Sequence, residues 1–175
     1  MNPVRAAVPD ERLREIGDDM ARTADEWFEA YGHSHQNGIN KLIHWVCVPL
    51  ITVTLLALLW EIPTGPLQGI APWFHWAYVL VAIAVVFYLR LSLSIAFGML
   101  IATACAIAIF IAWPSWFAIP MWQVALALFV LAWIGQFIGH AIEGEKPSFL
   151  EDIQFLLVGP AWLLHFIYRK VGIPY

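Results

Sequence analysis

The amino-acid sequence predicts an all-α fold: a polytopic membrane helical bundle of about four transmembrane helices, preceded by an amphipathic helix and followed by a broken or re-entrant segment. Two observations support this prediction. Hydrophobic residues make up 61% of the 175 residues and charged residues only 13%, whereas soluble domains carry about 25% charged residues. Most of the charge also lies before residue 42, and the remaining sequence is largely apolar with proline-rich breaks. We therefore treat residues 1–175 as a single membrane domain.

Residues 10–32 predict an amphipathic helix ahead of the first membrane span. Apolar side chains recur there at spacings of three and four residues, with acidic residues and arginines between them. These apolar residues are Leu13, Ile16, Met20, Ala24, Trp27 and Tyr31. We expect the helix to lie on the cytoplasmic membrane surface or to pack beneath the bundle.

Four apolar stretches are long enough to cross about 30 Å of hydrocarbon, which takes about 20 residues. They cover approximately residues 42–60, 73–89, 91–113 and 121–142. Proline-rich turns separate the first span from the second and the third from the fourth. Arg90 marks the turn between the second and third spans, because a guanidinium at the bilayer centre would cost at least ~2.5–3.5 kcal/mol.

A fifth apolar stretch, residues 153–168, is shorter and contains the pair Gly159-Pro160. Proline inside a helix removes a backbone donor and clashes with the preceding turn. We therefore expect this stretch to be a broken, re-entrant or interfacial segment rather than a fifth span.

The basic residues and the tryptophans predict the orientation of the bundle. With four spans, the basic residues that precede or separate the spans all fall on one side, which the positive-inside rule makes cytoplasmic. These residues are Arg5, Arg12, Arg14, Arg22, Lys41, Arg90 and Lys146. Six tryptophans then form an aromatic belt at the opposite interface: Trp60, Trp73, Trp76, Trp113, Trp116 and Trp122. The sequence leaves open whether the membrane is a bacterial inner membrane or the endoplasmic reticulum, and we favour the former.

Three histidines fall at the cytoplasmic ends of spans that are distant in the sequence. His35 and His44 lie at the start of the first span, and His140 lies at the end of the fourth. Neutral imidazole is a good ligand for iron, zinc, copper or nickel, so a metal site is one interpretation. The alternative is that these are ordinary histidines near the lipid headgroups. His75 falls on the opposite side and is expected to be an interfacial residue.

Polar residues with helical spacing accompany these histidines. Asn40 precedes His44 by four positions, and Tyr31 precedes His35 by four. Gln136, His140 and Glu143 form one stripe along the fourth span. A carboxylate in such a stripe could complete a ligand set or orient it.

Two motifs resemble a known family. The pattern Tyr31-x3-His35-x4-Asn40-x3-His44-x4-Pro49 is followed by the stretch WIGQFIGHAIEGEKPSFLEDIQFLLVGP at 133–160. Both resemble the small membrane proteins related to yeast 2-hydroxy fatty acid dioxygenase, over roughly residues 27–168. The resemblance implies an Fe(II)-dependent dioxygenase that converts 2-hydroxy fatty acids to the fatty acid one carbon shorter by α-oxidation.

The resemblance also implies residue roles. It makes His35, His44 and His140 the catalytic metal ligands. In the family the acidic residue lies four positions after the last motif histidine, whereas Glu143 lies three positions after His140. Candidates for a fourth ligand are Glu143, His33 and His165. Candidates for orienting ligands or substrate are Tyr31, Asn40 and Gln136.

The expected partners are a 2-hydroxy fatty acid, O₂ and membrane lipids, with Fe(II) as the cofactor. The net charge of −4 provides no basic surface for nucleic acid. Two alternatives remain: a non-catalytic membrane adaptor, assembly factor or carrier, and a metal-dependent lipid hydroxylase or hydrolase. The sequence also leaves open whether the bundle forms a homodimer.

Overall fold

The computed structural model describes residues 22–144, 146 and 155–175, and within these residues every regular element is helical. The helices are α2 (Ala24–His33), α3 (Gly38–Glu61), α4 (Ala77–Leu91), α5 (Leu93–Trp116), α6 (Met121–Glu143) and α7 (Phe155–Val171), with a short 3₁₀ helix η1 (Gly65–Gly69). The predicted all-α fold is confirmed. Of the predicted amphipathic helix, α2 is the described part, and residues 10–21 lie outside the described residues.

Helix α2 begins at a reciprocal capping arrangement. The Thr23 hydroxyl accepts from the Glu26 backbone N–H at 3.3 Å, and the Glu26 carboxylate accepts from the Thr23 backbone N–H at 2.6 Å. Two of the backbone donors at the start of the helix region are satisfied in this way. The apolar face of α2 is buried and includes Trp27, Phe28 and Tyr31. This face packs against α7 at one end of the molecule.

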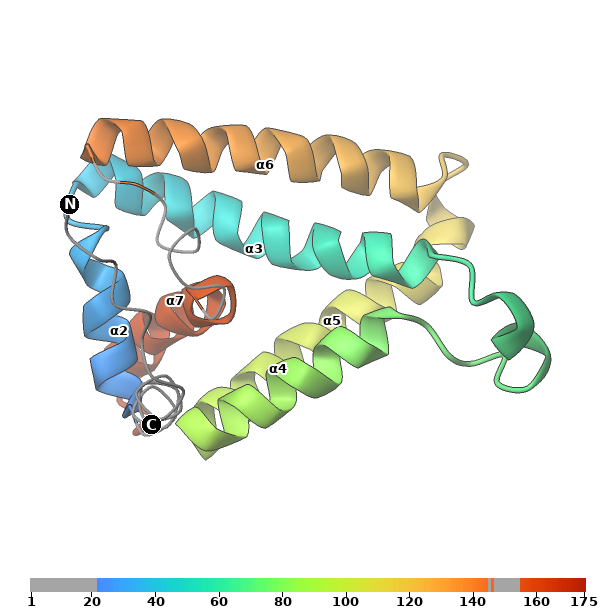
Figure 1. Ribbon diagram of the computed structural model, residues 1–175, viewed down its shortest axis with the longest axis horizontal. Helices are drawn as coiled ribbons and strands as arrows, with labels where there is room; N and C mark the ends of the chain where they lie inside the picture. The colour runs from blue at the N-terminus through green and yellow to red at the C-terminus, as the bar shows by residue number, and fades with distance from the viewer. Residues whose placement is uncertain (1–21, 145, 147–154) are drawn as a thin grey trace, which may run out of the picture.

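The helices form two arms that diverge from a common end (Figure 1). Helices α3 and α6 lie side by side as one arm, and the α4–α5 hairpin forms the other. The arms meet at a hydrophobic cluster that includes Leu56, Ala77, Phe110 and Met121. Helices α2 and α7 lie at the opposite end, where the arms are apart.

Two glycines let α3 and α6 approach closely. A Cβ atom at Gly135 would lie 2.7 Å from Sγ of Cys47, and one at Gly139 would overlap Oδ1 of Asn40. The pair has the G-x-x-x-G spacing, which brings helix backbones together in membranes through small residues. Sequence analysis did not single out this pair.

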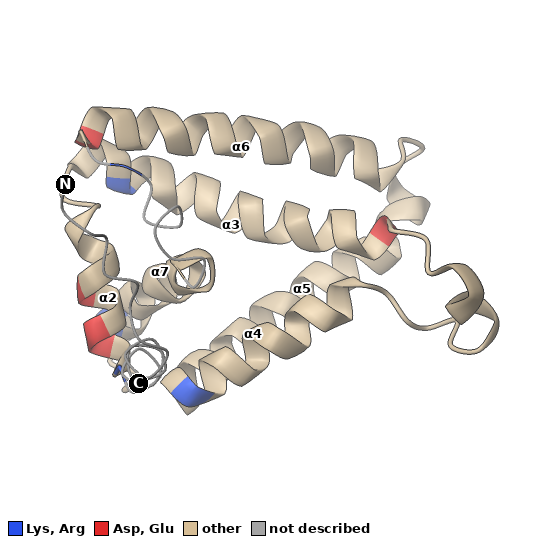
Figure 2. Cartoon of the chain, viewed as in Figure 1, with Lys and Arg blue, Asp and Glu red and all other residues tan. Residues whose placement is uncertain are grey.

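Three of the described helices, α3, α5 and α6, are long and apolar enough to cross a membrane, and α4 is a shorter apolar helix of 15 residues. Their outer faces carry many exposed apolar side chains, including Ile83, Phe97 and Leu131. Exposed apolar surface on this scale is unusual for a soluble protein. The described acidic and basic residues lie mainly at the end that holds α2 and α7 (Figure 2). These features support association with a membrane.

The second predicted span begins later than expected, at Ala77 rather than at residue 73. The preceding residues are held against the end of α3 instead. His75 donates from Nδ1 to the backbone carbonyl of Trp60 at 2.9 Å, and its ring stacks on Trp60 at 3.6 Å between centroids. His75 is thus a structural residue at the end of the molecule away from α2 and α7.

The C-terminal apolar stretch is one continuous helix, α7, where the sequence predicted a break at Gly159-Pro160. Proline leaves one helical carbonyl without its usual donor in this turn. The Tyr88 hydroxyl donates to the carbonyl of Leu157 at 2.9 Å and so adds an external partner in the same turn. Gly159 allows the turn to approach Tyr31, since a Cβ there would lie 3.0 Å from the Tyr31 hydroxyl.

Replacing Gly135 with Ala should destabilise the fold, because the added methyl group meets Cys47 Sγ at 2.7 Å. We expect a loss of about 1–3 kcal/mol in the free energy of unfolding, as for other overpacked sites. Adding Cys47→Ala should restore most of the loss by removing the opposing sulfur atom. Unfolding in detergent, followed by circular dichroism, measures both changes.

The control is Ala127→Val, which adds volume at an exposed position on the same helix. Equal stability of the Gly135→Ala variant and the wild type would contradict the proposed close contact.

Candidate metal centre

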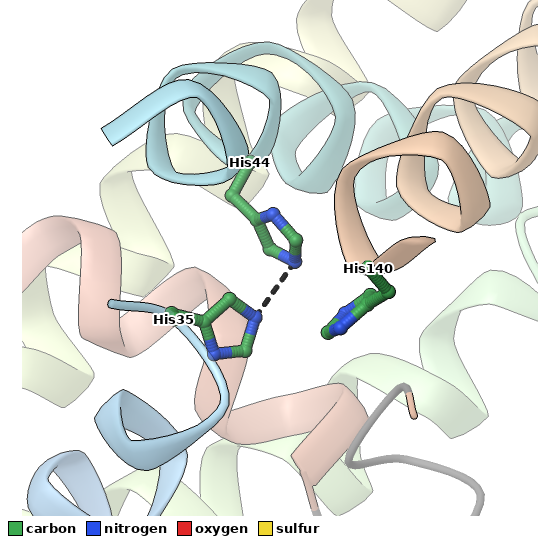
Figure 3. Close-up of side chains that lie close together, drawn as sticks. All are labelled: His35, His44 and His140. Atoms are coloured by element: carbon green, nitrogen blue, oxygen red, sulfur yellow. Dashed lines mark hydrogen bonds between the residues drawn. The ribbon is translucent and has the colours of Figure 1, made fainter. Parts of the chain in front are cut away.

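Three histidines from distant parts of the chain converge in the interior (Figure 3). His35 lies in the connection between α2 and α3, His44 in the second turn of α3, and His140 in the last turn of α6. Their side chains are 1%, 1% and 5% exposed. One ligand nitrogen from each ring lies within 4.8 Å of the other two. The structure therefore brings together the three histidines that topology and motif had singled out, and they could hold a metal ion.

Backbone hydrogen bonds fix the tautomers of two of these rings. Nδ1 of His35 is 2.6 Å from the carbonyl oxygen of Tyr31, and Nδ1 of His44 is 3.0 Å from that of Asn40. A carbonyl can only accept, so the proton of each neutral ring lies on Nδ1. The lone pair of each ring then lies on Nε2, and in metal sites such a bond at the other nitrogen orients the ligand.

The two Nε2 atoms face each other at 2.8 Å. Burial is the main cause that lowers the pKa of His35, to about 4, so this ring is neutral near pH 7. Two neutral rings with both Nδ1 atoms protonated present two lone pairs to one another, which is unfavourable. A cation bound by both Nε2 atoms would remove the conflict.

His140 adds an unsatisfied polar atom to the same site. Its Nδ1 is buried and has no hydrogen-bond partner in the described part of the chain. The ring centroid lies 5.0 Å from the centroids of both His35 and His44. Because buried polar atoms are rarely left unpaired, this atom further supports the fit of a metal ion.

Glu143 joins the end of α6 to the start of α3. Its carboxylate accepts from the backbone N–H of Gln36 at 2.7 Å and of Asn37 at 2.9 Å. It also accepts from the side-chain amide of Asn40 at 2.9 Å. These bonds hold the connection that carries His35 and the first turn of the helix that carries His44. Glu143 thus lies in a supporting network and outside the three-histidine group.

Tyr31 forms a wall of the site. Its ring stacks on His35 with centroids 4.2 Å apart and planes inclined by 15°. Burial raises the pKa of the Tyr31 hydroxyl, so the hydroxyl remains protonated. Trp162 of α7 lies behind the same two rings, 5.3 Å from Tyr31 and 5.5 Å from His35 between centroids. No pattern in the sequence distinguishes Trp162 from the other tryptophans of the chain.

The other predicted ligand candidates lie outside the group. His33 is exposed at the end of α2. His165 is buried on α7, where its ring stacks on Phe28 at 4.7 Å and its Nδ1 donates to the carbonyl of Trp162. Among the described residues, the candidate metal group contains His35, His44 and His140.

A largely apolar pocket with a cavity volume of about 100 Å³, partly open to its surroundings, adjoins the site. The three histidines and Tyr31 line one part of it, together with Gln136. Gln136 is 6% exposed, and its Oε1 atom is buried with no partner among the described residues. The site therefore offers a potential metal-binding group, an amide oxygen without a partner among the described residues, and adjoining apolar space.

Fold and site together define a membrane-associated helical protein with a buried three-histidine centre. Comparison with family models matches residues 21–171 to the Mpo1-like family, described as 2-hydroxy-palmitic acid dioxygenase Mpo1-like. The chain belongs to this family, as its two motifs predicted. No curated protein and no solved structure matches the chain.

Replacing Glu143 with Ala should weaken metal binding without changing the ligand set, because the carboxylate positions the ligands through backbone donors. We expect the affinity for Co²⁺, used as a coloured probe, to fall about 10–100-fold, as for other residues that support ligands. The visible spectrum at saturation should match that of the wild type. A changed spectrum at saturation would instead identify Glu143 as a ligand.

Proposed function

We propose that this protein is an Fe(II)-dependent dioxygenase that converts 2-hydroxy fatty acids to the fatty acid one carbon shorter. The observation that carries the proposal is the convergence of three buried imidazoles, two of them with Nε2 facing inward, in a chain of the Mpo1-like family. The reaction balances as one 2-hydroxy acid and one O₂ giving the shorter acid, CO₂ and water.

His35, His44 and His140 would hold the iron. Bound there, ferrous iron would supply a site for O₂ and a Lewis acid for the hydroxyl and carboxylate oxygens of the substrate. Three protein ligands leave coordination positions open for both. The protons on Nδ1 of His35 and His44 are committed to carbonyl oxygens, so these rings serve as fixed ligands rather than as proton donors.

Two side chains of the pocket wall are suited to bind the polar end of the substrate. Gln136 has an unpaired amide oxygen that can accept from the 2-hydroxyl group. The Tyr31 hydroxyl, whose pKa burial raises, stays protonated and can donate to the carboxylate. The near-complete burial of the three rings keeps bulk water away from the reacting end. Asn40 would support the ligands indirectly. Its side-chain amide donates to Glu143, and its backbone carbonyl accepts from Nδ1 of His44.

We further propose that the centre faces the cytoplasm. The described basic residues of α3, α4 and α7 lie at the same end of the molecule as the site (Figure 2), and the positive-inside rule places that end inside. The expectations of a bacterial inner membrane and of a possible homodimer stay predictions.

Removal of a ligand provides the main test. His140→Ala in detergent-purified protein should lose bound iron and, in assays with 2-hydroxypalmitate and O₂, should lower formation of the fifteen-carbon acid by at least about 100-fold. His33→Ala is the matched control, since His33 is exposed and close in sequence to the site. Iron is measured by elemental analysis and the product by mass spectrometry.

Each alternative predicts a different result in the same experiment. A non-catalytic adaptor or carrier would bind no stoichiometric metal. A lipid hydroxylase or hydrolase would bind metal without forming the shortened acid. Loss of iron in the His33→Ala variant would show that His33 is one of the metal ligands.

Gln136→Met tests the proposed substrate contact, because it retains most of the volume and removes the amide. We expect KM for a 2-hydroxy acid to rise about tenfold, as for the loss of one hydrogen bond to a charged or polar group. Iron content should stay at the wild-type level. A KM equal to that of the wild type would show that the amide makes no substrate contact.

A further inference from the structure

The pocket beside the histidines continues as a groove between the two arms of the fold. Its wall on α3 is formed by Val48, Ile51, Thr52, Leu55 and Leu56. Its wall on α4 is formed by Leu80, Val81, Ala84, Val85 and Tyr88. Residues of α5, α6 and α7 complete the lining. The arms meet away from α7 (Figure 1), at the hydrophobic cluster that includes Leu56.

The unpaired buried polar atoms of the described pocket lining lie at the histidine end of the groove. Two unpaired buried polar atoms, Gln136 Oε1 and His140 Nδ1, belong to residues that line the histidine end. Along the groove, the hydroxyl of Thr52 donates to the carbonyl of Val48 at 2.9 Å, and that of Tyr88 donates to Leu157 at 2.9 Å. These hydroxyls are already satisfied, so an alkyl chain beside them would leave no hydrogen bond unmade.

The chemistry of the lining restricts the occupant. Neither lysine nor arginine is among the described residues that line the pocket. A phosphate headgroup would therefore find no cationic partner there. A carboxylate with a neighbouring hydroxyl would instead find the amide of Gln136 and the proposed metal.

We propose that this groove holds the alkyl chain of a single long-chain 2-hydroxy acid and that its closed end limits the chain length. This inference rests on the proposed function. Between His44 and Leu56, α3 rises about 18 Å at ~1.5 Å per residue. One acyl chain spans one leaflet, or about half of the ~30 Å hydrocarbon core. The groove therefore has the length of one long acyl chain.

The proposed limit on the length of the alkyl chain lies where α3 meets α4. Leu56 is 6% exposed and belongs to the cluster that joins the arms, and Leu80 and Val81 pack against the same cluster. These side chains also line the pocket, so they form its far end. Ala84 lines the groove one helical turn nearer to the histidines, about 4.5 Å along α4.

Two phenylalanine substitutions should shorten the groove by different amounts. Val81→Phe should reduce turnover of the longest 2-hydroxy acids, and Ala84→Phe should do so at shorter chain lengths. The loss should be about fourfold for each methylene group that no longer fits, with short substrates unaffected. Leu56→Ala should shift the preference in the opposite direction. The matched control is Ala82→Phe, at an exposed position of the same helix outside the pocket lining.

Two readouts separate this inference from the proposed function. The first is product formation across a series of saturated 2-hydroxy acids, with iron content as a check of folding. The second is displacement of a fluorescent fatty acid from the metal-free protein by the same series. If the wild type forms no shortened acid, the proposed function fails, and displacement alone decides the inference. If Val81→Phe, Ala84→Phe and Leu56→Ala all keep the wild-type length profile, the inference is overturned.

Discussion

The close packing of α3 against α6 is the constraint on which the rest of the structure depends. Because Gly135 and Gly139 carry no side chains, α6 can lie directly against Cys47 and Asn40 of α3. This approach places His44 and His140, about a hundred residues apart in the sequence, with ring centroids 5.0 Å apart. Glu143, at the end of α6, accepts a hydrogen bond from the connection between α2 and α3. That connection carries His35, the third ring of the group. A larger distance between α3 and α6 would move His44 away from His140, even if all the helices still formed.

Much of the architecture could be predicted from the sequence, because the membrane spans fix the position of each residue along the membrane normal. Hydropathy located the apolar helices to within a few residues, and the turns at their ends placed His35, His44 and His140 in one layer. Residues at the same depth in a small helical bundle lie close together, because the bundle is only a few helices wide. Depth and motif were therefore sufficient to group the three histidines, although neither indicated which ring nitrogen would point inward.

The features that were missed depend on contacts between distant residues. Glu143 was expected to complete the ligand set or to orient it, and the sequence did not indicate that its oxygens accept from the backbone N–H groups of Gln36 and Asn37, which only the folded connection presents. Helix α7 was expected to break at Gly159-Pro160, yet Tyr88, which is 69 residues away from Leu157, supplies a hydrogen bond to that turn. Periodicity and propensity describe neighbours in the sequence, so neither contact leaves a local signal.

The arrangement of the three rings is one that a bound cation would stabilise. Burial keeps His35 neutral, and the carbonyl groups of Tyr31 and Asn40 hold both protons on Nδ1. The facing Nε2 lone pairs then repel each other, while the hydrogen bonds at both Nδ1 atoms hold the two rings in place. A cation at that point would be bound by both lone pairs and would remove the repulsion. Because these hydrogen bonds already direct both Nε2 atoms toward one point, the ligands would need little reorganisation to bind an ion.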